Sequence, residues 1–188
     1  TEDACARLRA TGAEALTLER AGLPLDPYFS ASKLAWILAR VPRAADLARR
    51  GRLRLGTTDA FFRDRLTGRF ETDATTASRT SLMDLRRLDW DAELCALFGV
   101  PIECLPRITP STGDLGGVLA GGRPVPLAAS LVDQQAATWG HGCRTPGDAK
   151  ITFGTGAFAF ALAGDRPPSD PQGALPTLAW ARAGEAPA

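Results

Sequence analysis

The segment SLVDQQAATWG, residues 130–140, places a carboxylate and a carboxamide side by side where a helix is expected to begin. Asp133 follows an apolar run, so it would lie at the carboxyl end of a strand, where open α/β sheets bind ligands. There Asp133 could accept the proton of a substrate hydroxyl, helped by the positive helix end, while Gln134 bonds a neighbouring hydroxyl. This pair suits a polyol, but Asp133 taken alone is more readily explained as an ordinary helix N-cap.

A second candidate is the Gly-Thr-Gly of residues 154–156, inside the strand-like run KITFGTGAF. Glycines let backbone N–H groups approach an anion, and Thr155 adds a hydroxyl donor, so this segment could cradle a phosphate. Three residues are weak evidence, and taken alone they favour a plain turn between two strands. Tyr28, the only tyrosine of the chain, precedes a helix and could be a simple interface aromatic.

The elements that would position these residues alternate between helix and strand. Apolar periodicity and end signals predict helices, the third of them capped by Ser30 and the fourth starting at Pro42. The strand patterns include a hairpin that bends at the Gly-Thr-Gly, and a Gly- and Pro-rich surface loop is expected over 106–126. The helices are expected over 1–10, 13–22, 30–40, 41–51, 57–68, 88–99 and 133–142, and the strands over 52–58, 125–132 and 149–164.

Composition excludes several classes of protein. With 188 residues and a formal charge of +1, the chain can bury a core and has no charge excess suited to nucleic acid or an anionic membrane. Its four cysteines form no C-x-x-C pair and it has one histidine, so no zinc site is expected. A reducing cytoplasm is the simplest location. No apolar run is long enough for a membrane span and no leader is evident, so we expect a soluble protein.

Taken in order, seven segments resemble the FGGY carbohydrate kinases. Within this family they resemble most the members that phosphorylate glycerol. The resemblance covers nearly the whole chain but only a middle part of the family's length. The segments are GLPLDPYFSASKLAWIL, RLRLGTTDAFFRDRLTG, TDATTASRTSLMDL, LDWDAELCALFGVP, LPRITPST, DQQAATWG and PGDAKITFGTGAF.

The resemblance implies an α/β fold of the actin-like (ribonuclease H-like) ATPase class, here incomplete. Residues 1–146 would be the remainder of the N-terminal, substrate-binding domain, and 147–188 the start of the C-terminal, ATP-binding domain. ATP and Mg²⁺ are the implied cofactors, and no resident metal site is expected in this chain.

Individual roles follow from the same resemblance. Asp133 matches the catalytic base, Gln134 and Tyr28 match residues of the polyol site, and Phe158 matches a phenylalanine near the polyol. Thr155, between Gly154 and Gly156, matches the threonine of a phosphate loop that faces the nucleotide.

The chain also departs from the family pattern. Val132 stands where Gly is usual, Thr76 where Asn is usual, and His141 where Gln is usual. The family's first phosphate loop, the Arg-Glu pair and Trp of the polyol site, and most of the ATP-binding domain have no counterpart here. The chain alone is therefore expected to be inactive and to be part of a longer protein.

Two classes of function remain open. The first is an ATP-dependent kinase that converts glycerol to glycerol 3-phosphate, or a relative that acts on another sugar such as xylulose. The second is a catalytically silent module that keeps the fold and acts as a binding or scaffold unit. An incomplete sheet would also leave an unpaired edge, which predicts a homo-oligomer or a covering chain segment.

Overall fold

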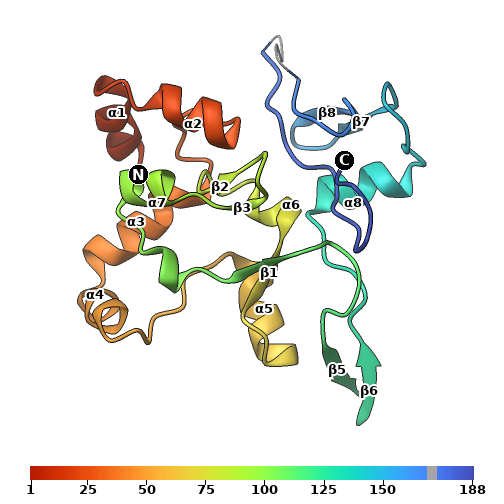
Figure 1. Cartoon of the computed structure of the whole chain (residues 1–188), viewed down its shortest axis with the longest axis horizontal. Helices are drawn as coiled ribbons and strands as arrows, with labels where there is room; N and C mark the ends of the chain where they lie inside the picture. Colours follow the sequence, from red (N-terminus) through yellow and green to blue (C-terminus); the bar gives the residue numbers. More distant parts are fainter. Residues whose placement is uncertain (169–172) are drawn as a thin grey trace.

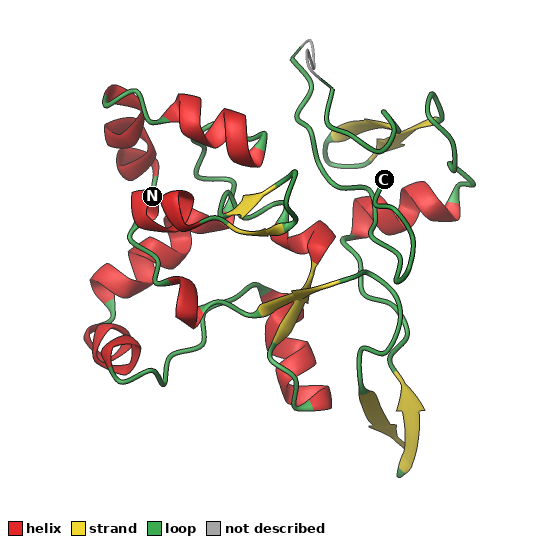
Figure 2. Cartoon of the chain, in the orientation of Figure 1, coloured by secondary structure: helices red, strands yellow, loops and turns green. Residues whose placement is uncertain are grey.

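The helices gather mainly on one side of the molecule in the computed structural model, which describes residues 1–168 and 173–188 (Figure 1). All seven predicted helices are present, and loops connect them to short strands (Figure 2). The helices are α1 (Glu2–Ala10), α2 (Glu14–Ala21), α3 (Ser30–Arg40), α4 (Pro42–Arg49), α5 (Thr58–Thr67), α6 (Ala74–Ala77), α7 (Ala92–Phe98) and α8 (Asp133–Gly140), with a short 3-10 helix at Ile102–Cys104.

Helix ends follow the local sequence with one exception. Gly22, Gly68 and Gly99 end α2, α5 and α7 in the left-handed conformation, which glycine adopts at little cost. The predicted Ser30 cap is wrong, because Ser30 lies inside the first turn of α3 and no side chain caps that helix. The Ala31 N–H of that turn instead donates to the carbonyl of Thr80, at 2.8 Å, so a tertiary contact replaces the cap.

The strands form four separate two-stranded sheets among the described residues. The parallel pair sits at the centre of the chain, and the predicted hairpin at the Gly-Thr-Gly is confirmed. The pairs are β1 (Glu71–Asp73) with β4 (Arg107–Thr109) in parallel, and β2 (Met83–Asp84) with β3 (Asp89–Trp90), β5 (Gly117–Ala120) with β6 (Arg123–Pro126), and β7 (Ala149–Phe153) with β8 (Ala157–Ala161), all antiparallel.

Three strand and loop predictions are wrong. Residues 52–58 pair with no strand, although the Leu55 N–H donates to the carbonyl of Cys104 at 2.8 Å. The segment 106–126 is not all loop, since it contains β4 and the β5–β6 hairpin, whose turn is made by Gly121 and Gly122 at positive φ. Residues 125–132 form no buried strand, because Val125 and Pro126 end the exposed strand β6, which stands out from the body (Figure 1), and residues 127–132 belong to no named strand.

The described residues bury four apolar clusters, including one large cluster and one beside α8. The large cluster lies beneath α1, α3 and α7 and includes Leu34, Leu82 and Phe98. A smaller one joins α8 to Leu162, directly after β8, and to the C-terminal segment, with Trp139 and Trp180 packed edge to face at 5.0 Å. All four cysteines are buried and unpaired. No helix in residues 1–168 or 173–188 is long and apolar enough to cross a membrane.

A buried ion pair fastens α5 to the parallel strands. Arg63 of α5 donates to the Glu71 carboxylate of β1 at 2.5 Å and to the Thr109 hydroxyl of β4 at 2.9 Å. Arg63 is 3% exposed, and this burial lowers the pKa of its guanidinium while Glu71 opposes that effect. Removing one partner of a buried pair leaves the other charge uncompensated, which is strongly destabilising.

We therefore predict that Arg63→Met destabilises the protein by about 3 kcal/mol, at the low end for a broken buried pair because exposed Arg107 also reaches Glu71. The free energy of unfolding by urea measures the effect. Arg65→Met is the matched control, since Arg65 is exposed on the same helix, and it should change little. Equal stability of the two variants would show that the ion pair does not hold α5 in place.

Candidate active site

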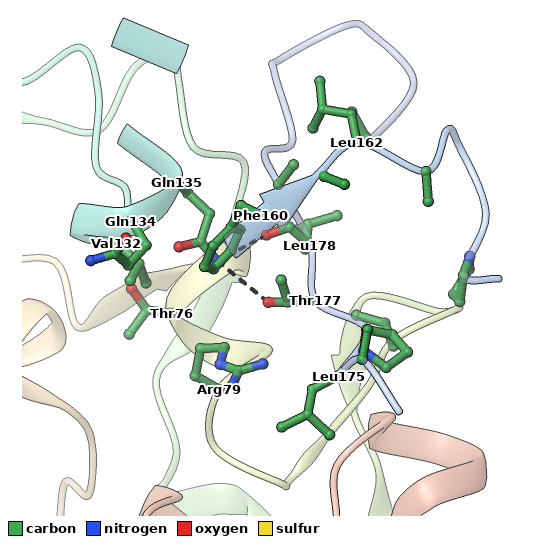
Figure 3. Close-up of a pocket in the computed structure, with 18 of the residues that line it drawn as sticks. Thr76, Arg79, Val132, Gln134, Gln135, Phe160, Leu162, Leu175, Thr177 and Leu178 are labelled. Carbon is green, nitrogen blue, oxygen red and sulfur yellow. Dashed lines mark hydrogen bonds between the residues drawn. The ribbon is translucent and has the colours of Figure 1, made fainter. Parts of the chain in front are cut away.

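A cleft of about 1920 Å³ opens between the helical part of the chain and the β7–β8 hairpin. The start of α8 forms one wall, and the loop before α3 and the start of α5 form another. Strand β8 and the returning segment 174–179 complete it. Figure 3 shows that the side chains of Thr76, Arg79, Gln134 and Phe160 gather at this cleft from elements far apart in the sequence.

Four of the predicted site residues line this one cleft. Tyr28, Asp133, Gln134 and Phe158 come from the loop before α3, from α8 and from β8. The Gly-Thr-Gly of residues 154–156 is not among the lining residues. The structure therefore brings the predicted polyol residues together but does not place the predicted phosphate loop in the same cleft.

Asp133 is the first residue of α8 and its carboxylate is exposed. The position before the helix is occupied by Val132, so Asp133 is not the N-cap. Its Oδ1 accepts only from the N–H of the next residue, Gln134, at 2.7 Å among the described hydrogen bonds. Most of its acceptor capacity thus faces the cleft, where a substrate hydroxyl could donate to it.

The start of α8 is tied to the centre of the molecule. The Val132 N–H donates to the Thr75 hydroxyl at 3.1 Å, and that hydroxyl donates to the Asp73 carboxylate at 2.6 Å. Asp73 is fully buried at the end of β1. Because Val132 directly precedes Asp133, this chain of bonds fixes the backbone position of the candidate base Asp133.

Tyr28 has a fixed backbone and a free side chain. Its N–H donates to Asp26 at 2.7 Å and its carbonyl accepts from the ammonium of Lys33 at 2.7 Å. The residue is 70% exposed, and its ring meets Phe29 edge to face. Its hydroxyl makes no hydrogen bond among the described contacts, so it is available to a ligand.

The structure accommodates two departures from the family pattern, Val132 and Thr76. Val132 has φ −64°, which any L-residue adopts, so glycine is not required there. The Thr76 hydroxyl donates to Asp73 at 2.6 Å while the side chain lines the cleft. His141, the third departure, directly follows α8 and does not line the cleft.

The tip of the β7–β8 hairpin is a tight, exposed turn. The Gly154 N–H donates to the Gly156 carbonyl at 2.9 Å, so that donor is satisfied inside the turn. A Cβ at Gly156 would lie 3.3 Å from the Phe158 ring, so a larger residue would push against it. Thr155 is exposed, and its hydroxyl is accessible to an anion. These features fit a phosphate contact without requiring one.

Sequence reasoning missed several polar residues of the cleft, among them Asp59, Arg79 and Lys150. Asp59 at the start of α5 accepts from the Thr72 hydroxyl at 2.6 Å. Arg79 lies over the Phe29 ring at 5.1 Å, and burial lowers the pKa of its guanidinium. Lys150 of β7 is 6% exposed and bonds Gln134. Their roles depend on tertiary contacts, and no local pattern marks them.

Known proteins share both the fold class and the family of this chain. The fold is an incomplete α/β domain of the actin-like ATPase class, as the solved structures below share it. Residues 1–140 match the model of the FGGY family of carbohydrate kinases, N-terminal domain, and the chain belongs to this family.

Curated relatives and solved structures agree. The chain is 46% identical to the glycerol kinase of Thermus brockianus over 99% of its length and 44% identical to glycerol kinase 1 of Pseudomonas aeruginosa over 96%. It spans only 38% and 37% of those proteins. A Plasmodium falciparum glycerol kinase structure with ADP superposes with a TM-score of 0.86 at 28% identity, over 93% of this chain and 36% of that one. A Rhodospirillum rubrum xylulose kinase gives 0.75 at 27% identity, over 90% and 35%.

The Thr75 link predicts a local effect at the start of α8. Thr75→Val removes the acceptor of the Val132 N–H, so that amide should exchange with deuterium roughly tenfold faster, as expected for the loss of one net hydrogen bond. Hydrogen exchange with mass spectrometry of the peptide that spans Val132 measures this. Thr75→Ser keeps the hydroxyl and should retain the protection. Equal exchange in all three proteins would mean that Thr75 does not anchor α8.

Proposed function

We propose that the protein carrying this chain phosphorylates a polyol with ATP, and that glycerol is its substrate. The observation that carries the proposal is the convergence of Asp133, Gln134, Tyr28 and Phe158 in one cleft. The same chain is 43–47% identical to proteins named glycerol kinase. The product would be glycerol 3-phosphate.

In the proposed reaction, Asp133 acts as general base. A substrate hydroxyl donates its proton to the carboxylate as its oxygen forms a bond to the γ-phosphorus of ATP, and the bond to the ADP oxygen breaks. A positioned base of this kind supplies roughly 10²–10⁴ in rate. The exposed acceptor side of Asp133, held by Val132 and Thr75, supports this role.

The other lining residues would bind and orient the polyol. Gln134 and the Tyr28 hydroxyl would hydrogen-bond its hydroxyl groups, and Phe158 would pack against its carbon atoms. Holding the attacking oxygen in line with the phosphate accounts for much of the acceleration in such transfers.

ATP would supply the phosphoryl group and Mg²⁺ would neutralise its charge. No group of three or more His, Cys, Asp or Glu side chains that could hold a metal ion gathers in the described part of the chain. Magnesium in kinases is commonly held by one or two carboxylates and the phosphates, so Asp133 could contribute one ligand. Gly154, Thr155 and Gly156 would contact the nucleotide phosphates.

The proposed domain division places 1–146 in the substrate-binding domain and 147–188 in the ATP-binding domain. The family match that ends at residue 140 supports a boundary near there. The four unpaired cysteines support a reducing compartment such as the cytoplasm. A homo-oligomer remains a prediction that sedimentation velocity of the full-length protein would test.

Two alternatives are weaker. A xylulose kinase is favoured by structural neighbours of that name at 27% identity, well below the identity of the glycerol kinases. A silent binding module would keep the cleft but show no turnover. A substrate panel separates all three.

We predict that the full-length protein phosphorylates glycerol with ATP and Mg²⁺, and that Asp133→Asn lowers kcat by roughly 10²- to 10⁴-fold with a small change in KM, because the amide cannot accept the proton. Coupled ADP release over a panel of glycerol, xylulose and other polyols measures both. The control is Asp114→Asn, which removes an exposed carboxylate away from the cleft and should be fully active. Undiminished turnover in Asp133→Asn would reject Asp133 as base, and turnover of xylulose alone would reject glycerol.

A further inference from the structure

Lys150 of β7 is a buried ammonium with polar but no acidic partners. Its Nζ donates to Oε1 of Gln134 at 2.8 Å and to the Thr152 hydroxyl at 2.6 Å, and it lies 5.6 Å from the centroid of the Phe160 ring. No carboxylate lies within ion-pair distance among residues 1–168 and 173–188. Burying an ammonium is costly unless its donors are satisfied. The hydrogen bonds to Gln134 and Thr152 therefore offset the cost of burying the Lys150 charge.

This contact decides which way the Gln134 carboxamide faces. A lysine ammonium has three donors and no acceptor, so the atom beside it must be the amide oxygen and cannot be the nitrogen. The Thr152 hydroxyl accepts from Lys150 and lies 3.5 Å from the same oxygen, where it can donate weakly. Both lone pairs of Oε1 therefore have donors on the β7 side, and a flip of the amide would place N–H groups against an ammonium.

The Gln134 nitrogen is left for the cleft. None of the described hydrogen bonds uses Nε2 of Gln134, and the residue lines the cleft next to Asp133. Asp133 offers only acceptors when ionised, and Gln134, held in this way, offers only donors. Adjacent acceptor and donor groups suit two neighbouring hydroxyls of a substrate, one that gives up its proton and one whose oxygen accepts a hydrogen bond.

We propose that Lys150 is a positioning residue that fixes Gln134 as a hydrogen-bond donor toward the polyol, and so contributes to the choice of a vicinal diol. This inference rests on the proposed function and adds the residue that sets the polarity of one substrate contact. Lys150 also comes from the hairpin assigned to the proposed second domain, whereas Gln134 comes from the first. The orientation of a substrate contact thus depends on a bond across the proposed domain boundary.

The kinetic test compares Lys150→Met, Gln134→Ala and the double variant in the full-length protein. Lys150→Met should lower kcat/KM for glycerol roughly tenfold, mainly through KM, because a binding hydrogen bond is lost. The double variant should be no worse than Gln134→Ala within about twofold, since Lys150 acts through Gln134. Independent, multiplying losses in the double variant would overturn the proposal.

Two further variants separate orientation from charge and from folding. Lys150→Gln keeps a neutral donor and should retain more activity than Lys150→Met. Thr152→Val removes only the weaker donor and should give a smaller loss of the same kind. Arg7→Met is the control for the loss of one positive charge, because Arg7 is exposed on α1. Should Lys150→Met fail to fold, Lys150→Gln and Thr152→Val are each combined with Gln134→Ala, and the same comparison of single and double variants is made with them.

A readout without catalysis distinguishes failure of this inference from failure of the proposed function. The side-chain NH₂ resonances of Gln134, assigned through Gln134→Ala in a ¹H–¹⁵N spectrum of glutamine-labelled protein, should shift in Lys150→Met and stay in place in Arg7→Met. Unmoved resonances overturn the inference whether or not the protein is active. A wild-type protein without turnover on any polyol rejects the proposed function, and shifted resonances would then still support the Lys150–Gln134 contact.

Discussion

The site depends on one fully buried carboxylate, that of Asp73 at the end of β1. It accepts hydrogen bonds from the amides and hydroxyls of Thr75 and Thr76, and from the Ser111 hydroxyl at 3.1 Å. A buried charge is tolerated only when its acceptor positions are filled, and these donors fill them. Through its partners Asp73 connects β1, α6, the segment after β4 and the start of α8.

Around this anchor the molecule divides into a fixed part and an open part. The Asp73 and Thr75 contacts hold the start of α8, and the Arg63–Glu71 pair holds α5 against the same strands. The β7–β8 hairpin is instead exposed over much of its surface, with Phe153 at 81%. It contacts α8 through the Lys150 bonds, and Leu162, directly after β8, joins the Trp139–Trp180 cluster. This arrangement suits the proposed reaction, because the proposed base Asp133 lies on the more firmly held part and the proposed phosphate-binding turn lies on the exposed hairpin.

Local rules predicted most helices because their signals lie within a few residues: Pro42 at the start of α4, Gly68 after α5 and Gly99 after α7. The strands are harder to predict, since the alternation in 52–58 does not reveal that no partner strand lies beside it. In the apolar run 125–132, only Val125 and Pro126 lie in a strand, the exposed β6. The clustering of Asp133 with Tyr28 was expected from the family resemblance. Lys150 could not be found, because its partner is set by how β7 packs on α8.

The bond between Ser111 and Ala181 has a consequence for how the chain is made. Ser111 accepts from the Ala181 N–H through its hydroxyl at 3.2 Å, donates its own N–H to the Ala181 carbonyl at 2.6 Å, and also binds Asp73. The two residues are 70 positions apart. At about 5–20 residues per second, a ribosome adds the second residue roughly 4–14 s after the first. During translation the hydrogen bonds of Ser111 beside Asp73 therefore stay incomplete until Ala181 has been synthesised. Codon choice between these positions could alter the yield of native protein.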